Sequence, residues 1–372
     1  MHALIIGGGI GGLAAAIALH RHGWQVRVLE QAPAFTEVGA GLSIQPNALR
    51  ALEALGLGDQ VRAHALADAP VGIRRADGTW LIRNDIDRLT RRHGPWLTLH
   101  RADLLAILHQ ALPPESLETG VQVHQVRPDG TVTHTDGTCT ADVVVGADGV
   151  HSATRRSLWP DAPPPRYVGY TTWRMIAAAR PVEGSVETWG QGQRFGYAPM
   201  ADGRVYCYAM ANATQGTTIG MADLRRRFAG WHHPIPALLD TGSPDAVLQH
   251  DTYELPDLDT YVAGRVALLG DAAHAMTPNL GQGAGQALED AVVLARSLEA
   301  ARLGDTPVAE ALRAYDRARR PRTQMIARRS RRLGEMVHRA STPFAVARDT
   351  AMRITPSSVV ARSMTPVLSW TA

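Results

Sequence analysis

The chain has 372 residues, of which 45% are hydrophobic and 20% charged, a composition that suits a globular protein of more than one domain. Its 38 basic and 35 acidic side chains leave a net charge of only +3, which argues against a nucleic-acid partner. No apolar run reaches the roughly 18 residues that cross a bilayer, and glycines interrupt the apolar stretch at 4–19. We therefore expect no transmembrane segment and no signal peptide. Cys139 and Cys207 lack metal-ligand or redox spacing, so we expect reduced thiols, no metal site and a cytoplasmic protein.

A nucleotide-binding pattern opens the chain. An apolar run at residues 3–7 leads into a G-x-G-x-x-G motif, an Ala/Leu-rich helix to residue 22 and a second apolar strand at 25–29. The three glycines serve a tight turn, close approach of a pyrophosphate, and close packing of helix on strand, while the helix N-terminus attracts phosphate. An acidic residue after the second strand accepts ribose hydroxyls and disfavours a 2′-phosphate. The pattern predicts a dinucleotide site, without distinguishing NAD from FAD, formed by Gly7, Gly9, Ile10, Gly11, Gly12 and Glu30.

Two further motifs follow buried-strand patterns. The apolar run at 141–145 leads into a Gly-Ala-Asp-Gly sequence at 146–149. A later strand pattern at 265–269 ends in Gly-Asp-Ala-Ala-His at 270–274, followed by a glycine-rich segment at 278–285 and a helix from about residue 286 to 301.

With these three motifs in this order, the sequence resembles the single-component (group A) flavoprotein aromatic hydroxylases, the family of p-hydroxybenzoate hydroxylase. The resemblance runs from residue 1 to about residue 330. It implies FAD as the cofactor and an α/β fold. In that fold a Rossmann-like FAD-binding domain carries an inserted, mostly antiparallel β-sheet substrate domain, and helices follow at the C-terminus.

The resemblance also assigns single residues to the flavin. Asp271 would hydrogen-bond the ribityl chain, and the backbone N–H groups near Gly283 and Ala284 would face the pyrimidine edge, where a helix N-terminus stabilises negative charge. Asp148 matches a motif near the pyrophosphate and the transient nicotinamide site. Five further residues of this chain match family positions that contact FAD through a side chain, the backbone or a loop. They are Gly41, Arg101, Val123, Pro278 and Gly281.

The expected surroundings of Gly41, Val123 and His274 can be stated more closely. The segment 39–47, which contains Gly41, matches the loop beside the isoalloxazine, but it also reads as a plain strand entry before a helix. Val123 matches a strand position whose backbone meets the adenine. For His274 we expect a structural role beside the cofactor.

The mechanism that the resemblance implies has three stages. NADPH or NADH reduces FAD, O₂ adds to give a flavin C4a-hydroperoxide, and one oxygen passes to a small aromatic or N-heteroaromatic substrate. The chain has no second dinucleotide fingerprint, which fits a nicotinamide that visits and leaves. An epoxidase or an antibiotic-modifying monooxygenase is the alternative, and a non-enzymatic flavin-binding protein is a remote one. The base that deprotonates the substrate is not identifiable from these patterns.

The domain boundaries follow from the same patterns. We assign residues 1–70, 98–164 and 256–300 to the FAD-binding domain, and 71–97 and 165–255 to the substrate sheet. Residues 301–372 form a C-terminal helical region. Ten arginines between 313 and 339 predict a solvated helix, with a weak membrane-surface contact or a lid over an acyl chain as alternatives. The protein is expected to be a monomer or homodimer.

One hairpin carries the candidate substrate residues. Strands at 193–200 and 204–210 flank a turn, and a three-residue loop with a left-handed Gly203 would place Arg194, Tyr206 and Tyr208 on one face. Gly196 and Ala198 on that face would leave room for a planar ring. A two-residue loop would separate Arg194 from Tyr206, and an exposed sheet face is the plain alternative.

Some segments also resemble particular enzymes within the family, and these resemblances suggest substrates. The hairpin is similar to that of FAD-dependent urate hydroxylases, whose substrate-binding Arg and Tyr match Arg194 and Tyr206. Residues 172–174, 270–282 and 342–343 look nearest to 2-alkyl-4-quinolone 3-monooxygenases, followed by salicylate hydroxylases. Arg174 would anchor an anionic substrate or form a structural ion pair.

Overall fold

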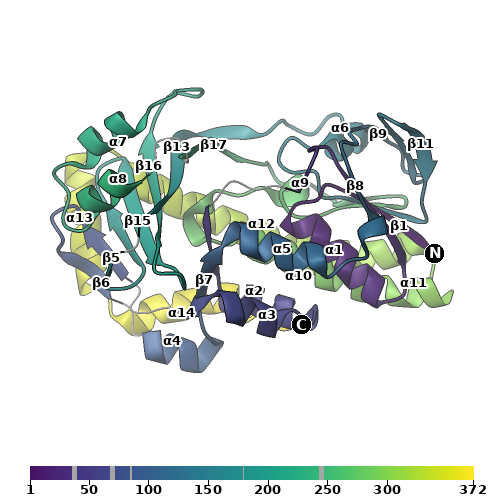
Figure 1. The fold of residues 1–372 in the computed structure, drawn as a ribbon, viewed down its shortest axis with the longest axis horizontal. Coiled ribbons are helices and arrows are strands. Elements are labelled where there is room, and N and C mark those ends of the chain that lie inside the picture. Colours follow the sequence, from purple (N-terminus) through teal and green to yellow (C-terminus); the bar gives the residue numbers. More distant parts are fainter. Residues whose placement is uncertain (36–39, 68–71, 84–85, 179, 243–246) are drawn as a thin grey trace.

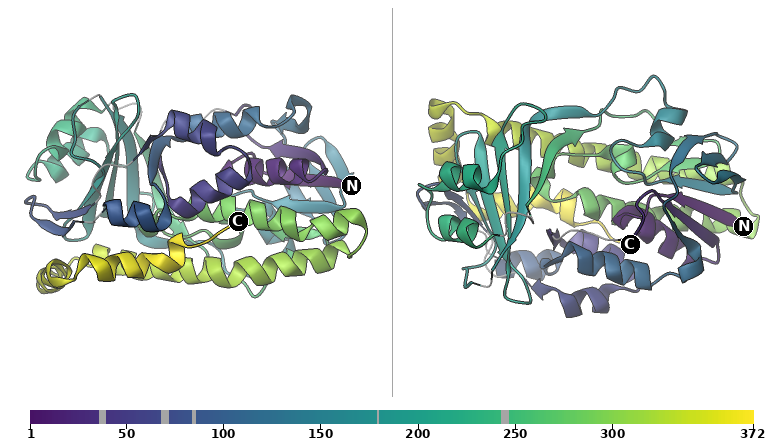
Figure 2. Two further views of the ribbon diagram at one scale, coloured as in Figure 1. Left: turned by 90° about the horizontal axis from the view of Figure 1, so that it is seen from below. Right: turned by 45° about the horizontal axis from the view of Figure 1, so that its top comes forward.

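A computed structural model describes residues 1–35, 40–67, 72–83, 86–178, 180–242 and 247–372. The predicted loop at 39–47 is therefore described only from residue 40 onwards. Figure 1 shows an elongated molecule with one large sheet near each end. A long helix, α12 (Val308–His338), runs between the two ends and contacts a strand of each sheet (Figure 2).

The sheet near the N-terminus is the nucleotide-binding type predicted from the sequence. It has six strands, all parallel except for one antiparallel edge strand. Its central strands are continuous apolar runs because both faces of the sheet are covered. The strand order is β18 (Val262–Ala263), β19 (Val266–Leu268), β12 (Val143–Gly146), β1 (His2–Ile6), β2 (Gln25–Glu30) and β8 (Leu117–Thr119).

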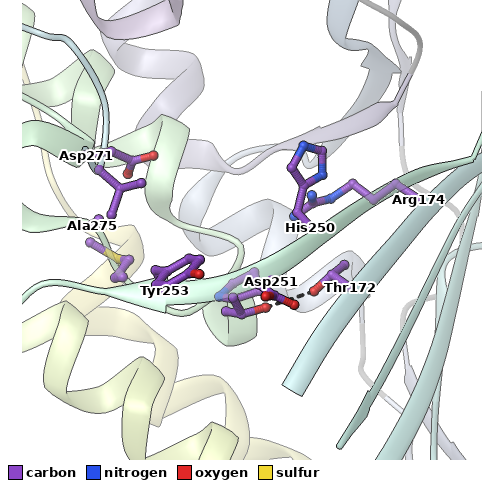
Figure 3. A pocket seen from close by; sticks show the side chains of 11 residues that line it. Thr172, Arg174, His250, Asp251, Tyr253, Asp271 and Ala275 are labelled. Carbon is purple, nitrogen blue, oxygen red and sulfur yellow. Dashed lines mark hydrogen bonds between the residues drawn. The ribbon is translucent and has the colours of Figure 1, made fainter. Parts of the chain in front are cut away.

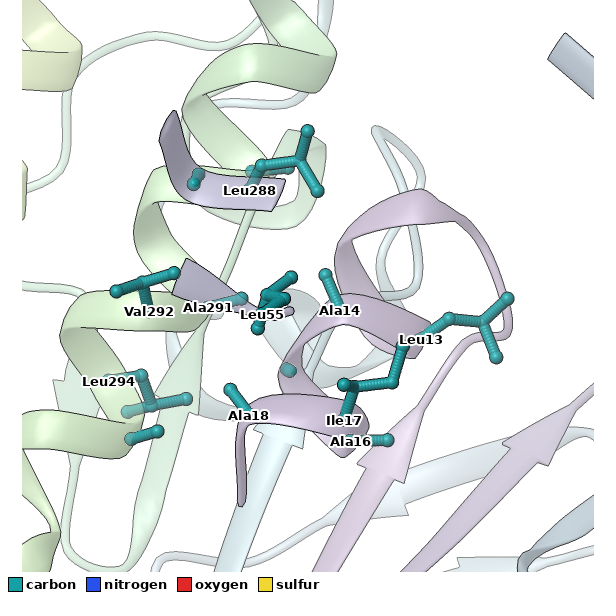
Figure 4. Close-up of a cluster of buried hydrophobic side chains, with 14 of the residues drawn as sticks. Leu13, Ala14, Ala16, Ile17, Ala18, Leu55, Leu288, Ala291, Val292 and Leu294 are labelled. Carbon is teal, nitrogen blue, oxygen red and sulfur yellow. The ribbon is translucent and has the colours of Figure 1, made fainter. Parts of the chain in front are cut away.

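Helices α1 (Ile10–Arg21) and α10 (Gly283–Ser297) pack side by side in the main core on one face of this sheet (Figure 4). Ala14 and Ala18 of α1 and Ala291 of α10 are almost fully buried, and such small side chains allow the two helix backbones to come close. The opposite face packs on a small sheet made of β9 (Val123–Val126), β10 (Thr131–His134) and β11 (Gly137–Thr140).

The second large sheet has seven strands and is mostly antiparallel, as predicted. The order is β17 (Leu248–Glu254), β13 (Arg166–Ala177), β16 (Val205–Asn212), β15 (Gln193–Pro199), β14 (Val186–Trp189), β5 (Gly72–Arg75) and β6 (Trp80–Arg83). These strands fall within the ranges 71–97 and 165–255, although the division of the chain into domains stays a prediction.

Side chains alternate sharply across this second sheet. Trp173, Phe195 and Cys207 point to one face, where they form an apolar core with α7 (Met221–Phe228) and α8 (Ile235–Thr241). The residues between them in sequence point to the other face and are largely polar. No helix of that apolar core covers the polar side, so that side is available to meet the nucleotide-binding half.

The remaining elements are a small sheet and several helices. A second small sheet has the order β3 (Gly41–Ile44), β7 (Leu97–His100) and β4 (Leu66–Ala67). The other helices are α2 (Pro46–Ala54), α3 (Gly58–His64), α4 (Ile86–His93), α5 (Arg101–Gln110), α6 (Ala153–Leu158), α9 (Asp271–His274), α11 (Glu299–Leu303), α13 (Thr342–Ile354) and α14 (Ser357–Leu368), with single turns η1 (Pro114–Ser116) and η3 (Pro278–Leu280). None of the helices in the described ranges combines the length and the apolar character that a bilayer crossing requires.

The arginine-rich helix α12 is not the simple solvated helix that the sequence predicts. The side chain of Arg319 is only 1% exposed, and its guanidinium lies 2.6 Å from Glu289 Oε2 and 2.6 Å from Asp290 Oδ1 on α10. The second oxygen of Asp290 accepts a bond from His274 Nε2 at 2.6 Å, so α9 joins the same cluster. A buried charge is tolerated only when it is paired, and Glu289 and Asp290 provide that pairing for Arg319.

We predict that Asp290→Asn lowers the free energy of unfolding by about 3 kcal/mol or more, because Arg319 and His274 lose their buried anion. Chemical denaturation at neutral pH measures this change, with the exposed Glu310→Gln on α12 as the matched control. The cluster lowers the pKa of Asp290 to about 2, so its stabilisation is full above the ordinary value of 3.8 and is lost as pH falls towards 2. Equal stability of both variants at pH 7 would contradict the role given to the cluster.

Candidate active site

The loop between β1 and α1 has the shape that a pyrophosphate requires. A Cβ placed on Gly9 would meet no heavy atom within 4 Å, whereas a Cβ on Gly12 would collide with the carbonyl oxygen of Gly7. The predicted roles of the second and third glycines, an open approach and close helix–strand packing, are therefore visible in the packing. Helix α1 starts at Ile10, and no side chain caps its N-terminus, so its first N–H groups remain available to an anion.

Glu30 lies at the mouth of this loop. Its Oε2 accepts a hydrogen bond from the Gly8 N–H at 2.6 Å, and its Oε1 accepts one from the Ala32 N–H at 2.8 Å. The side chain is partly exposed, and each carboxylate oxygen has a further lone pair that can accept from a ribose hydroxyl. Val123 is buried with Leu29 in the core below, so this edge of the sheet is where the adenosine end is expected.

The carboxylate of Asp148 is occupied by helix α6. Oδ1 accepts from Ser152 Oγ at 2.6 Å, and Oδ2 accepts from the Thr154 N–H at 2.9 Å. Asp148 thus holds the start of α6 in place, and it orders the loop after β12 through its side chain. A contact of this residue with the pyrophosphate or a nicotinamide stays a prediction.

Around α9 and α10 the structure forms a second helix N-terminus without a side-chain cap. Helix α10 begins at Gly283, and a Cβ placed there would lie 3.9 Å from Asp271 Oδ1. The exposed carboxylate of Asp271 and the N–H groups of Gly283 and Ala284 therefore border one space. This pairing of an acceptor with a positive helix end fits the ribityl chain and the pyrimidine edge of a flavin.

A hydrogen-bond network fixes the segment before α2 to this glycine-rich loop. Gln45 Nε2 donates to the Leu280 carbonyl at 2.7 Å, and Gln282 Nε2 donates to Gln45 Oε1 at 2.6 Å. A Cβ on Gly281 would lie 2.9 Å from Gln45 Nε2, so the two segments are in close contact. The end of the segment 40–47 is thereby held beside Gly281, while the flavin contact predicted for Gly41 stays a prediction.

His274 takes the structural role expected for it. Its imidazole is buried and bound to Asp290 behind α9, away from the exposed Asp271. Its position orders the turn that presents Asp271.

The predicted hairpin geometry is confirmed. Pro199 pairs with Val205, the turn is three residues long, and Gly203 has a φ of +82°. Because Gly196 pairs with Tyr208 and Ala198 pairs with Tyr206, the candidate residues share one face. We define the polar face of the seven-stranded sheet by the side chains of Thr172, Arg174, Glu187, Arg194, Tyr206, Tyr208 and His250.

The expectation that small residues leave room for a ring on this face is wrong at Gly196. A Cβ there would collide with the ring of Tyr208, so that tyrosine already fills the space. Gly41 of β3 is similarly filled by the ring of Tyr206. The second contact is informative, because it brings a predicted flavin residue against a predicted substrate residue.

Arg194 is bound to other residues of the protein. Its side chain is 1% exposed; Nη1 donates to Glu187 Oε1 at 3.1 Å, and Nη2 donates to Asn279 Oδ1 at 2.5 Å. Tyr208 donates to the other oxygen of Glu187 at 2.5 Å, and burial is the main reason that its pKa is raised. Asn279 belongs to η3, so Arg194 links the polar face to the predicted flavin loop and is already neutralised by Glu187.

A cavity of about 190 Å³ lies where the polar face meets α9 and η3 (Figure 3). Its walls bring Arg174, predicted for substrate, together with Asp271 and Pro278, predicted for FAD. Arg174 is partly exposed there. His250, also in the wall, was missed by sequence reasoning, although the alternation of residues along β17 places it beside Thr172 on this face.

Arg101 at the start of α5 lies near enough to His250 in the cavity wall for its charge to act on that imidazole. The backbone N–H of Arg101 donates to the Ala40 carbonyl at 2.8 Å, and this bond joins α5 to the segment leading into β3. The pKa of His250 is lowered by burial and by the positive charges of Arg174 and Arg101. Positive charge from Arg174 and Arg101 therefore gathers at the His250 end of the cavity, while Asp251 and Asp271 line other parts of it. An anionic group of a ligand is favoured at the arginine end.

Comparisons with known proteins agree with this geometry. A family model described as FAD binding domain matches residues 1–330. The chain is 39% identical over 346 residues to aurachin C monooxygenase/isomerase of Stigmatella aurantiaca, covering 90% of this chain and 88% of that protein. It is 39% identical over 366 residues to 3-amino-4-hydroxybenzoate 2-monooxygenase of Streptomyces cremeus, covering 94% and 91%. The structure of Klebsiella pneumoniae HpxO with FAD and uric acid superposes with a TM-score of 0.91 at 29% identity, covering 99% and 97% of the two chains.

A parallel sheet with an open glycine loop, a second uncapped helix N-terminus and an inserted sheet defines a flavin-nucleotide enzyme. The chain belongs to the FAD binding domain family of group A flavin monooxygenases, and it is an FAD-dependent monooxygenase. The fold class, the family and the cofactor predicted from the sequence are confirmed. The parts that single residues play stay predictions.

We predict that Gly9→Ala weakens FAD binding at least about tenfold, or 1.4 kcal/mol, while the unfolding of the FAD-free protein is unchanged. The reason is that the added methyl meets no protein atom but enters the space where the pyrophosphate must approach. Flavin fluorescence titration measures the affinity. Gly230→Ala, which also has open space around it, is the matched control and should bind FAD normally. Normal FAD affinity in Gly9→Ala would place the pyrophosphate elsewhere.

Proposed function

We propose that the enzyme hydroxylates a small planar aromatic or N-heteroaromatic acid or phenol, held in the cavity between the polar face and the flavin. The observation that carries this proposal is the cavity wall itself, in which Arg174 and His250 stand opposite Asp271 and Pro278. The relatives support the substrate class: aminohydroxybenzoate, urate and salicylate, named for three of them, are small aromatic or heteroaromatic compounds.

The binding of FAD is proposed to follow the order of the motifs. The N-terminus of α1 would hold the pyrophosphate through N–H groups near Gly9, and Glu30 would accept the ribose hydroxyls. Asp271 would bind the ribityl chain, and the start of α10 would face the pyrimidine edge. Bound FAD supplies the hydride-accepting and oxygen-activating chemistry that no side chain can perform.

The residues of the polar face divide into a frame and a binding wall. Arg194, Glu187 and Tyr208 are bonded to one another and to η3, so they fix the position of the sheet relative to the flavin loop. Arg174 points into the cavity and would pair with a carboxylate or phenolate of the substrate. Bound flavin and substrate would have to keep water from the reacting atoms, because water would waste the activated oxygen as peroxide.

A reduced nicotinamide is the proposed electron source, and NADH and NADPH are both candidates. In the cytoplasm the enzyme, as a monomer or a homodimer, would have access to both nucleotides. The 2-alkyl-4-quinolone type of substrate, to which residues 172–174 point, is a second candidate.

We predict that Arg174→Gln raises KM for an anionic aromatic substrate about 10- to 100-fold, since a charge-assisted hydrogen bond contributes about 1.5–3 kcal/mol. FAD affinity should change little. Substrate-stimulated oxidation of NADH and NADPH, with peroxide release measured in parallel, gives KM and coupling for a panel of benzoates, phenols, quinolones and purines.

The control is Arg317→Gln, an exposed arginine on α12, which should leave KM unchanged. The neutral amide of the best carboxylate substrate should be insensitive to Arg174→Gln. If Arg174→Gln leaves KM for the anion at the wild-type value, Arg174 is not the anchor. If no aromatic compound stimulates nicotinamide oxidation by the wild type, the proposed substrate class is wrong.

A further inference from the structure

We propose that His250 is the general base that removes the proton from the ring hydroxyl or ring N–H of the substrate, while Arg174 stabilises the oxyanion that results. This inference rests on the proposed function, because it assigns a step to the cavity proposed there. It supplies the proton acceptor that sequence patterns did not identify.

The position of His250 makes it suitable. On β17 it pairs with Thr172 of β13, and Arg174 lies two residues further along β13 on the same face. All three side chains line the cavity that also contains Asp271 and Pro278 (Figure 3). His250 is accessible to solvent, although the protein around its imidazole partly desolvates it, and within the described ranges no protein group hydrogen-bonds to its ring nitrogens. A substrate hydroxyl can therefore reach a ring nitrogen directly.

Of the other carboxylates near the cavity, Asp251 and Glu187 are hydrogen-bonded within the protein, and Asp271 is the one proposed for the flavin. Asp251 accepts bonds from Thr171 Oγ1 and from the Gly216 N–H, both at 2.7 Å. Glu187 is held by Arg194 and Tyr208 on strands further along the sheet. Asp271 borders Gly283 at the predicted flavin side.

The charges around His250 suit a base that is neutral before reaction. Burial first, and then the positive charges of Arg174 from β13 and Arg101 from α5, lower its pKa, which favours the uncharged imidazole at neutral pH. Tyr206 from β16 is also near Arg174 and Arg101, and burial raises its pKa, so it stays protonated. The other titratable groups that border the cavity are Asp251 and Tyr253 on β17 and Asp271 on α9.

The proposed step transfers one proton and no electrons between molecules. The O–H or N–H bond of the substrate breaks, its electron pair stays on the oxygen or in the ring, and an N–H bond forms on His250. The imidazolium and the oxyanion attract each other, and Arg174 pairs with the oxyanion. The ring becomes richer in electrons at the positions ortho and para to the oxygen, which favours its attack on the oxygen atom supplied in the established reaction. After turnover the proton passes to solvent.

The first test compares His250→Gln with His124→Gln, an exposed histidine on β9 far from the cavity. General-base catalysis typically contributes about 10²- to 10⁴-fold, so kcat for a phenolic substrate at pH 7 should fall by that factor in His250→Gln alone. The wild-type rate should rise through a pKa below 6.5 and then level off. In His250→Gln, kcat should instead rise towards the pKa of the substrate, and added imidazole should restore part of the rate.

A second test needs no turnover. Titration of bound 4-nitrophenol follows phenol and phenolate by their different absorbance, with FAD-loaded protein and the FAD-only spectrum subtracted. The wild type and His124→Gln should bind phenolate at a pH lower than free 4-nitrophenol ionises. In His250→Gln that shift should shrink, while the part due to Arg174 remains.

The outcomes separate the two proposals. If the wild type binds 4-nitrophenol and hydroxylates aromatic compounds, but His250→Gln keeps its pH profile and its phenolate titration, His250 is not the base. If the wild type neither binds 4-nitrophenol nor responds to any aromatic compound, the proposed function itself is overturned.

Discussion

The proposed active site is positioned by one buried guanidinium. Arg319 on α12 is bonded to Glu289 and Asp290 on α10, and Asp290 is in turn bonded to His274 on α9. These charges are almost fully removed from water, so they are tolerated only in this mutual arrangement. The arrangement fixes the turn that carries Asp271 against the start of α10. Asp271 and the N-terminus of α10, which the resemblance assigns to the flavin, are thereby positioned by the ion pairs of Arg319.

A second set of contacts joins the substrate sheet to that frame. Asn279 of η3 accepts from Arg194, and the ring of Tyr206 rests on Gly41 of β3. The opposite face of the sheet is filled by an apolar core with α7 and α8, and the polar face is the one that meets the segments proposed for the flavin. The cavity with Arg174 and His250 is what remains between these two bodies once the contacts are made.

The sequence predicts the parts of this molecule that depend on local patterns. The glycine loop with Glu30, the strand-to-motif transitions at 146 and 270, and the three-residue turn at Gly203 each follow from spacing over a few residues. Arg194, Tyr206 and Tyr208 share one face because side chains alternate between the two faces along each β-strand.

What the sequence does not reveal depends on partners far apart in the chain. The space beside Gly196 is filled by Tyr208, and Arg319 is buried instead of solvated, since a helix rich in arginine does not indicate which side chain meets two acids on another helix. His250 went unnoticed because no motif surrounds it; its place in the cavity comes from the pairing of β17 with β13. Side-chain packing of this kind needs the tertiary structure.

The most direct test of the account is a crystal structure of the FAD-loaded enzyme with a bound aromatic acid. The account predicts that the aromatic ring lies between the flavin and the polar face, with its acidic group at Arg174 and a ring oxygen or nitrogen beside His250. A substrate bound away from Arg174 and His250, or a flavin ring that does not lie between Asp271 and the polar face, would contradict it.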